Sequence, residues 1–131
     1  MSKIHRCQIQ VRGYELDSYQ HVNHANYLNY LEHARWQLLD SEGITLPRLN
    51  EWKRWPVIAE INIKYIKPAF MGDTLDIETE VTGMRRVGFA LEQRIYRSGT
   101  LILEAKIGSV IVNEAGRPDS LPEAFKALFT A

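Results

Sequence analysis

Apolar and polar positions alternate along most of the second half of the chain, which is typical of β-strands with one buried face. The alternation is clearest in residues 57–67 and 74–81, and it continues through residues 89–97 and 101–112. Residues 4–12, near the N-terminus, also come close to alternating. The pattern therefore predicts five strands, of which the last four follow one another directly.

Residues 24–43 follow a helical period instead. At 100° per residue, one side of the helix carries mostly apolar side chains and the other side carries polar ones. Asn23 is expected to cap this helix, because its side chain can accept the backbone N–H of residue 25 or 26. Asn26 is expected to reach back toward the cap, and Gly43 to end the helix in the left-handed conformation. The expected apolar side comprises Tyr27, Leu28, Leu31, Ala34, Leu38 and Leu39.

The remaining segments are expected to connect these elements. Residues 44–56, which include Pro47 and Pro56, are interpreted as a connecting segment. The Ser-Gly pair at 98–99 predicts a hairpin turn, and residues 120–130 predict a short helix with Ser120 as its cap. Because short turns join consecutive strands, antiparallel pairing is expected.

Together these elements predict an α+β fold, in which an antiparallel β-sheet wraps around one long central α-helix. A helix of about 20 residues covers about 30 Å of sheet. We expect residues 1–131 to form a single domain, since this length supports a hydrophobic core. The polar half of the helix and any uncovered sheet edge favour a homodimer or a dimer of dimers. In the strand 57–67, the face expected to be apolar carries Val57, Ala59, Ile61, Ile63 and Tyr65.

The composition narrows the classes of function. Sixteen Lys and Arg residues balance 16 Asp and Glu residues, which argues against nonspecific nucleic-acid binding. The single cysteine, Cys7, excludes an internal disulfide and fits a reducing compartment. No secretory signal is visible, and no apolar run reaches the length of a membrane span. We therefore expect a cytoplasmic protein that binds neither nucleic acid nor membrane.

The stretch YELDSYQHVNHANY, residues 14–27, concentrates polar side chains just before the expected helix. A cap at Asn23 cannot satisfy every backbone N–H of the first turn, and the N–H of His24 is the one expected to stay free. An unpaired N–H at the positive end of a helix is a donor for an oxyanion. Asp17 lies seven residues earlier, so a curled loop can bring its carboxylate close to that N–H.

A carboxylate and an oxyanion donor are sufficient for the hydrolysis of a thioester. The leaving group can depart as a thiolate, because a thiol has a pKa of about 8.5. Asp17 can act as a general base toward water or as the nucleophile itself. The alternative, from the residues alone, is that Asp17 and Asn23 only form a turn and a helix cap, since both residue types are common in turns.

The segment VRGYELDSYQHVNHANYLNYLEHARW, residues 11–36, resembles hotdog-fold acyl-CoA thioesterases of the 4-hydroxybenzoyl-CoA thioesterase type, and is most similar to bacterial long-chain acyl-CoA thioesterases. Residues 61–77 resemble the next strands of that family. The resemblance implies active sites at a dimer interface, with the catalytic aspartate at Asp17 and the carbonyl-polarising backbone amide at His24. Some members carry GG or MG after the aspartate, where this chain has Tyr19 and Gln20.

The resemblance further implies a hydrolase of fatty acid metabolism that converts medium- to long-chain fatty acyl-CoA to free acid and CoA, without a metal or redox cofactor. Two alternatives stay open: a thioesterase acting on acyl groups of acyl carrier protein, and a non-catalytic acyl-CoA binding module. Basic side chains near turns suit the phosphates of coenzyme A. His21 is expected either to orient the loop by hydrogen bonds or to touch the thioester. The candidate substrate-binding residues are Tyr19, His21, Asn23, Lys67, Arg85 and Arg86.

Other chemistry-bearing residues have less specific patterns. Glu32 and Arg35 are three apart on the helix, so they are expected to pair with each other at the core edge or at a dimer interface. A catalytic role for Glu32 is the rival interpretation. His21, His24 and His33 lack a completing ligand, so no metal site is expected. Five aromatic residues are expected either to line an acyl tunnel or to pack in the core: Trp36, Trp52, Trp55, Phe70 and Phe89.

Overall fold

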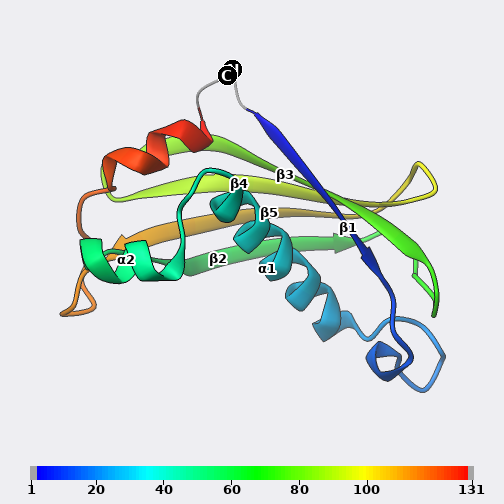
Figure 1. Ribbon diagram of the computed structural model, residues 1–131. Coiled ribbons are helices and arrows are strands. Elements are labelled where there is room, and N and C mark those ends of the chain that lie inside the picture. Colours follow the sequence, from blue (N-terminus) through cyan, green and yellow to red (C-terminus); the bar gives the residue numbers. More distant parts are fainter. Residues whose placement is uncertain (1–2, 130–131) are drawn as a thin grey trace.

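The computed structural model describes residues 3–129 and contains a five-stranded antiparallel sheet that curves around one long helix (Figure 1). The strand order is β1-β3-β4-β5-β2. This arrangement confirms the α+β fold predicted from the sequence. The strands are β1 (Ile4–Gln10), β2 (Trp55–Tyr65), β3 (Thr74–Arg85), β4 (Gly88–Arg97) and β5 (Thr100–Val112), and the long helix is α1 (His24–Ser41).

The three strands in the middle of the sheet form two consecutive hairpins. β3 pairs with β4, and β4 pairs with β5, each with an antiparallel register. The turn between β4 and β5 has positive φ at both Ser98 (49°) and Gly99 (81°), which is the geometry that suits a two-residue hairpin. The predicted Ser-Gly turn is therefore confirmed. β1 pairs with β3 and β2 pairs with β5, so β1 and β2 are the two edge strands. Along the sequence, α1 lies between these two strands.

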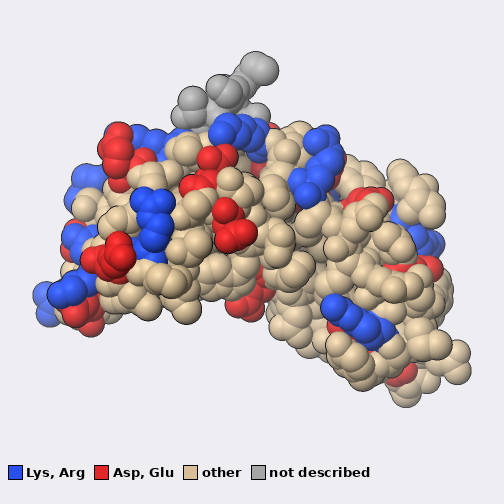
Figure 2. All heavy atoms as spheres, in the orientation of Figure 1, with Lys and Arg blue, Asp and Glu red and all other residues tan. Residues whose placement is uncertain are grey.

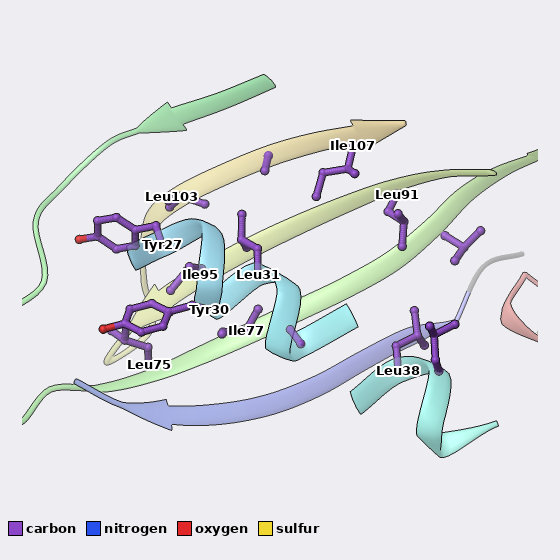
Figure 3. Close-up of a cluster of buried hydrophobic side chains, with 14 of the residues drawn as sticks. Tyr27, Tyr30, Leu31, Leu38, Leu75, Ile77, Leu91, Ile95, Leu103 and Ile107 are labelled. Carbon is purple, nitrogen blue, oxygen red and sulfur yellow. The ribbon is translucent and has the colours of Figure 1, made fainter. Parts of the chain in front are cut away.

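The core lies between α1 and the inner face of the sheet (Figure 3). Tyr27, Leu31 and Leu38 of the helix are buried. The predicted apolar side was wrong at one position, because Leu28 is 40 % exposed while Tyr30 is 1 % exposed. The hydroxyl of Tyr30 has a buried acceptor, and this bond allows a polar-tipped side chain to enter the core. The sheet side chains drawn opposite the helix include Leu75, Ile77, Leu91, Ile95, Leu103 and Ile107.

β2 is an edge strand, and most of its apolar side chains are exposed within one chain. Val57 is 43 % exposed and Tyr65 is 51 % exposed, although both lie on the face predicted to be apolar. Ile58, on the other predicted face, is 41 % exposed, and a register shift between Ile58 and Glu60 interrupts the alternation. Ile63 alone of the predicted face packs partly against the core. The helix contacts mainly β1 and β3, which leaves the β2 edge uncovered.

The segment interpreted as a connection contains a helix. α2 spans Leu46–Trp52, with Pro47 in its first turn and a left-handed residue, Lys53 (φ 55°), at its end. A proline in the first turn removes no helical hydrogen bond, so it is compatible with this helix. Leu49 is fully buried and anchors α2 to the core. The interpretation of residues 44–56 as a connection alone was therefore wrong.

The two predicted boundaries of helical segments fare differently. Gly43 has φ of 72°, as predicted for the residue that follows α1. The predicted C-terminal helix is a 3₁₀ segment, Glu123–Leu128, which Ser120 does not cap; its last predicted position, residue 130, lies outside the described residues. On the face drawn in Figure 2, acidic and basic side chains are interspersed, as the balanced charge implies.

Candidate active site

The polar loop between β1 and α1 is closed by backbone hydrogen bonds. The chain leaves β1 at Val11, whose N–H donates to the carbonyl oxygen of Asp73 at 2.9 Å. It then forms a 3₁₀ turn, Gly13–Glu15, and Leu16 forms an isolated antiparallel bridge with Val22. The loop of residues 16–22, called here the Asp17 loop, therefore folds back on itself and ends beside the start of α1 (Figure 1).

Asp17 is half-buried and is held by its own loop. Its Oδ1 atom accepts the backbone N–H of Tyr19 at 2.9 Å and that of His21 at 3.2 Å. The N–H of Asp17 donates to the carbonyl oxygen of His21 at 2.8 Å. Its Oδ2 atom has no hydrogen-bond partner among residues 3–129. One carboxylate oxygen is thus fixed in place, and the other is available to a bound molecule.

The start of α1 carries the predicted cap. The side-chain oxygen of Asn23 accepts the N–H of Ala25 at 2.9 Å, and its backbone oxygen accepts the N–H of Asn26 at 2.9 Å. Within residues 3–129, the N–H of His24 donates to no acceptor. Asn26 does not reach back to the cap as predicted, because its side chain donates to the carbonyl oxygen of Glu15 at 3.1 Å.

Asp17 lies within electrostatic reach of the first turn of α1. Burial raises the pKa of the Tyr27 phenol, and the negative charge of Asp17 is one of the further causes of this increase. The oxygen of Tyr27 accepts the N–H of Ala69 at 3.1 Å, and the carbonyl oxygen of Ala69 accepts the N–H of Val22 at 2.9 Å. The peptide of Ala69 therefore connects the helix to the end of the Asp17 loop.

The turn between β2 and β3 packs against the other side of the loop. His21 forms an isolated bridge with Phe70, and the two rings meet edge to face with centroids 5.1 Å apart. Arg97 lies over the Phe70 ring, with its guanidinium carbon 5.4 Å from the ring centre. Tyr19 projects from the loop and is 81 % exposed. The side chains of Tyr19 and His21 thus lie on the accessible side of the loop and the neighbouring turn.

A buried carboxylate that sequence analysis missed lies at the base of the loop. Glu15 is 6 % exposed and accepts three hydrogen bonds: from the Tyr30 hydroxyl at 2.7 Å, from the Arg12 N–H at 2.8 Å and from the Arg12 guanidinium at 3.1 Å. Burial, followed by this bond to Glu15, raises the pKa of Tyr30. Residues 15 and 30 share no local periodicity, so the sequence carried no signal of their contact.

The chain matches a family model described as thioesterase-like superfamily over residues 11–129. It belongs to the thioesterase-like superfamily. The hotdog fold and thioester hydrolase activity predicted from the sequence are confirmed by this membership.

Two curated relatives and one solved structure support the same assignment. The chain is 36 % identical to the long-chain acyl-CoA thioesterase FadM of Escherichia coli K12, over 81 % of each chain. It is 32 % identical to the chloroplastic acyl-acyl carrier protein thioesterase ATL2 of Arabidopsis thaliana, over 95 % of this chain and 68 % of that protein. The crystal structure of a probable thioesterase from Bartonella henselae superposes with a TM-score of 0.88 at 27 % identity, covering 92 % of this chain and all of that one.

Not all predicted site residues of this thioesterase meet within one chain. Lys67 lies in the turn beside the Asp17 loop, where its N–H donates to the carbonyl oxygen of Ile102 at 3.1 Å. Arg85 is the last residue of β3 and Arg86 follows it, about 35–40 Å along the strand from its first residue, Thr74. A single chain does not bring these two arginines to the loop, so their assignment to substrate binding stays a prediction.

The Glu32–Arg35 pair expected on α1 of this thioesterase is not formed by a direct contact. Arg35 donates to the side chain of Gln93 at 3.0 Å, and burial lowers the pKa of its guanidinium. Glu32 accepts a bond from the indole of Trp36 at 3.4 Å instead. The buried amide of Gln93 provides a competing acceptor from β4, which helix spacing alone could not reveal.

A pocket of about 110 Å³ opens between the second half of α1 and the sheet, and its lining is mainly apolar. Trp36 and Phe89, two of the aromatic residues expected in an acyl tunnel, line it together with Ile58 of the β2 edge. Trp52 instead packs against Phe125, and Phe70 lies beside the Asp17 loop. The pocket therefore borders α1, the helix whose first residue is His24.

Within residues 3–129 of this thioesterase, no group of three or more His, Cys, Asp or Glu side chains is placed to hold a metal ion. None of the helices in this range has the length and apolar character needed to cross a bilayer. The cytoplasmic location expected from the sequence stays a prediction.

Proposed function

We propose that this protein hydrolyses medium- to long-chain fatty acyl-CoA to free acid and coenzyme A, with Asp17 as the reacting carboxylate. The observation that carries the proposal is that the two oxygens of this carboxylate differ in their hydrogen bonds. Oδ1 accepts two backbone N–H groups, while Oδ2 has no hydrogen-bond partner among residues 3–129. The unpaired N–H of His24 lies at the start of the same helix that borders the loop. Both groups required by the chemistry are thus present and uncommitted.

The reaction needs only these two groups. The thioester carbonyl oxygen accepts the N–H of His24, which lies at the positive end of the α1 dipole. Asp17 removes a proton from water, and the resulting hydroxide adds to the carbonyl carbon. The oxyanion then collapses, the C–S bond breaks, and coenzyme A leaves as a thiolate that gains a proton from solvent, while Asp17 returns its proton to solvent. If Asp17 itself attacks, the thiolate leaves as an acyl anhydride forms, and water then hydrolyses the anhydride.

The pocket along α1 is the proposed place for part of the acyl chain. It is lined by apolar side chains from the helix and from strands β2 and β4, including Leu38, Ile58 and Leu91. Burial of hydrocarbon in such a pocket is favourable in proportion to the area removed from water. The similarity to FadM, which is named as a long-chain acyl-CoA thioesterase, supports the same substrate class.

We further propose that the active form is a homodimer built across β2. The apolar side chains of this edge strand are exposed in the single chain, and an uncovered apolar edge strand is prone to pair with another chain. Tyr65, at one end of the strand, contacts His24. A second copy on β2 would therefore lie next to the proposed reaction site, and a dimer of dimers is the larger assembly to test for.

Acyl groups on acyl carrier protein are the second candidate substrate. The similarity to ATL2, an acyl-acyl carrier protein thioesterase, covers 95 % of this chain and favours this alternative. Thiol release measured with a panel of acyl-CoA chain lengths, and with the same acyl groups on acyl carrier protein, distinguishes the two. The proposal expects the highest kcat/KM with medium- to long-chain acyl-CoA. Preference for the carrier protein would support the alternative, and acyl-CoA binding without any thiol release would support a binding module.

A further inference from the structure

Glu15 is joined to both proposed reacting groups through the backbone. It precedes Asp17 by two residues, so it forms the base from which the Asp17 loop projects. Its carbonyl oxygen accepts the N–H of Asn23 at 2.8 Å, and Asn23 immediately precedes His24. The same carbonyl oxygen accepts the side-chain amide of Asn26 at 3.1 Å. The position of Glu15 therefore sets the position of the loop relative to the helix start.

The side chain of Glu15 is in turn held by the second turn of α1. The Tyr30 hydroxyl donates to Glu15 Oε1 at 2.7 Å, and Tyr30 is 1 % exposed. Figure 3 shows the hydroxyls of Tyr27 and Tyr30 pointing toward the same end of the core, away from the aliphatic cluster. Arg12 closes the arrangement with its N–H and its guanidinium. Every carboxylate oxygen of Glu15 is thus engaged, and its orientation is fixed.

A buried carboxylate is a poor means of adding stability. Removing its charge from water is costly, and a well-packed apolar pair of similar volume is often as stable or more stable. The hydrogen-bonded arrangement does provide direction, because one donor comes from the helix α1, the other two come from Arg12, and together they fix the position of the carboxylate. Its contribution is therefore expected in the geometry of the loop more than in the free energy of unfolding.

We propose that Glu15 and Tyr30 are positioning residues that hold the Asp17 carboxylate at its working distance from the His24 N–H. The inference rests on the proposed function, because it assigns these residues to the same reaction. Neither side chain touches the reacting atoms. Tyr30 acts through Glu15, and Glu15 acts through the backbone on either side of the loop.

Tyr30→Phe removes the hydroxyl and keeps the ring that packs in the core. Misplacement of a reacting group by about 1 Å can cost about 100-fold in rate, so kcat is expected to fall by about 10–100-fold while KM is unchanged. Tyr96→Phe, which removes a hydroxyl on β4 that forms no hydrogen bond among residues 3–129, is the matched control and is expected to keep the wild-type kcat. An unchanged kcat in folded Tyr30→Phe would overturn the inference.

Asn26→Ala provides a second variant that keeps the core intact. It removes the hydrogen bond from the side-chain amide of residue 26 to the Glu15 carbonyl oxygen, and alanine favours the helix. The inference predicts a lower kcat with a wild-type melting temperature. A wild-type kcat in this variant as well as in Tyr30→Phe would exclude positioning through Glu15.

The Asp17→Asn background separates this inference from the proposed function. If Tyr30 acts through Asp17, Tyr30→Phe has no further effect on the residual rate of Asp17→Asn, whereas a general structural defect multiplies with it. Full activity of Asp17→Asn itself would overturn the proposed function. A large loss in Asp17→Asn with a multiplicative effect of Tyr30→Phe would overturn only the positioning role.

Discussion

The hydroxyl of Tyr65 donates to the carbonyl oxygen of His24 at 3.0 Å, so the edge strand β2 contacts the first residue of α1. Tyr65 is 51 % exposed, and its ring also meets that of Tyr27 with centroids 5.6 Å apart. The surface proposed to pair with a second copy and the residues proposed to bind the thioester carbonyl are therefore contiguous. Loss of the dimer is expected to impair the reaction.

Ile61→Glu tests this connection. Ile61 lies in the middle of β2 and is 36 % exposed in the single chain, so a carboxylate there is tolerated by the monomer but would be buried without a partner in the dimer. We expect a monomeric mass in light scattering and a large fall in kcat/KM. Asn62→Glu places the same charge at the adjacent position, on the opposite face of the strand, and is expected to remain dimeric. A monomeric wild-type protein with full activity would contradict the dimer proposal.

Asn23→Ala tests the contribution of the helix cap to the site. The substitution removes the bond to the N–H of Ala25, and loss of such a cap typically costs about 1 kcal/mol of stability. The first turn, which carries the His24 N–H, is expected to fray. The variant should therefore lose kcat even though its free energy of unfolding decreases only slightly. Urea unfolding and steady-state thiol release measure the two effects. A stable variant with wild-type kcat would show that the cap does not support the reaction.

The elements that the sequence predicted correctly are those specified by local pattern. Asn23 and Gly43 bracket α1 because capping chemistry and a left-handed residue are local requirements. Leu28 was misassigned to the apolar side, and Tyr30 was not among the residues predicted to be buried, because the wheel gives the direction of a side chain around the helix and not the acceptor that it meets. Tyr30 enters the core because Glu15 accepts its hydrogen bond there.

The same limit explains the rest of the differences. The alternation in β2 predicts a buried face, but this face is buried only where another element covers the strand. In the single chain, that edge of the sheet is open. Within the site, Asp17 and His24 could be proposed from the loop and the helix start. Glu15 could not, because its burial depends on contacts with Tyr30, 15 residues away, and with Arg12.

The buried phenol of Tyr30 predicts a stability loss at alkaline pH. Its pKa is raised above the usual value of about 10, first by burial and then by Glu15. The unfolded chain therefore releases this proton at lower pH than the folded chain, so stability is complete below about pH 10 and decreases as pH rises further. The slope is about 1.4 kcal/mol per pH unit for one such group.

The measurement is urea unfolding between about pH 8 and about pH 11. Tyr30→Phe is expected to flatten the alkaline decrease relative to wild type. Tyr96→Phe, which removes a β4 hydroxyl that forms no hydrogen bond among residues 3–129, is expected to leave the decrease unchanged. Identical slopes for wild type and Tyr30→Phe would show that this phenol is not held as described.

Asp17→Asn tests the central claim most directly, because it changes one atom of the site. An asparagine oxygen can still accept the N–H groups of Tyr19 and His21, so the loop keeps its bonds while the unpartnered oxygen becomes an amide nitrogen. Asp40→Asn, on the exposed side of α1, is the control for loss of one negative charge. In thiol release from a long-chain acyl-CoA, the account predicts a fall in kcat of about 10²–10⁴ for Asp17→Asn and a wild-type kcat for Asp40→Asn. Equal kcat for wild type and Asp17→Asn, with both proteins folded, would contradict it.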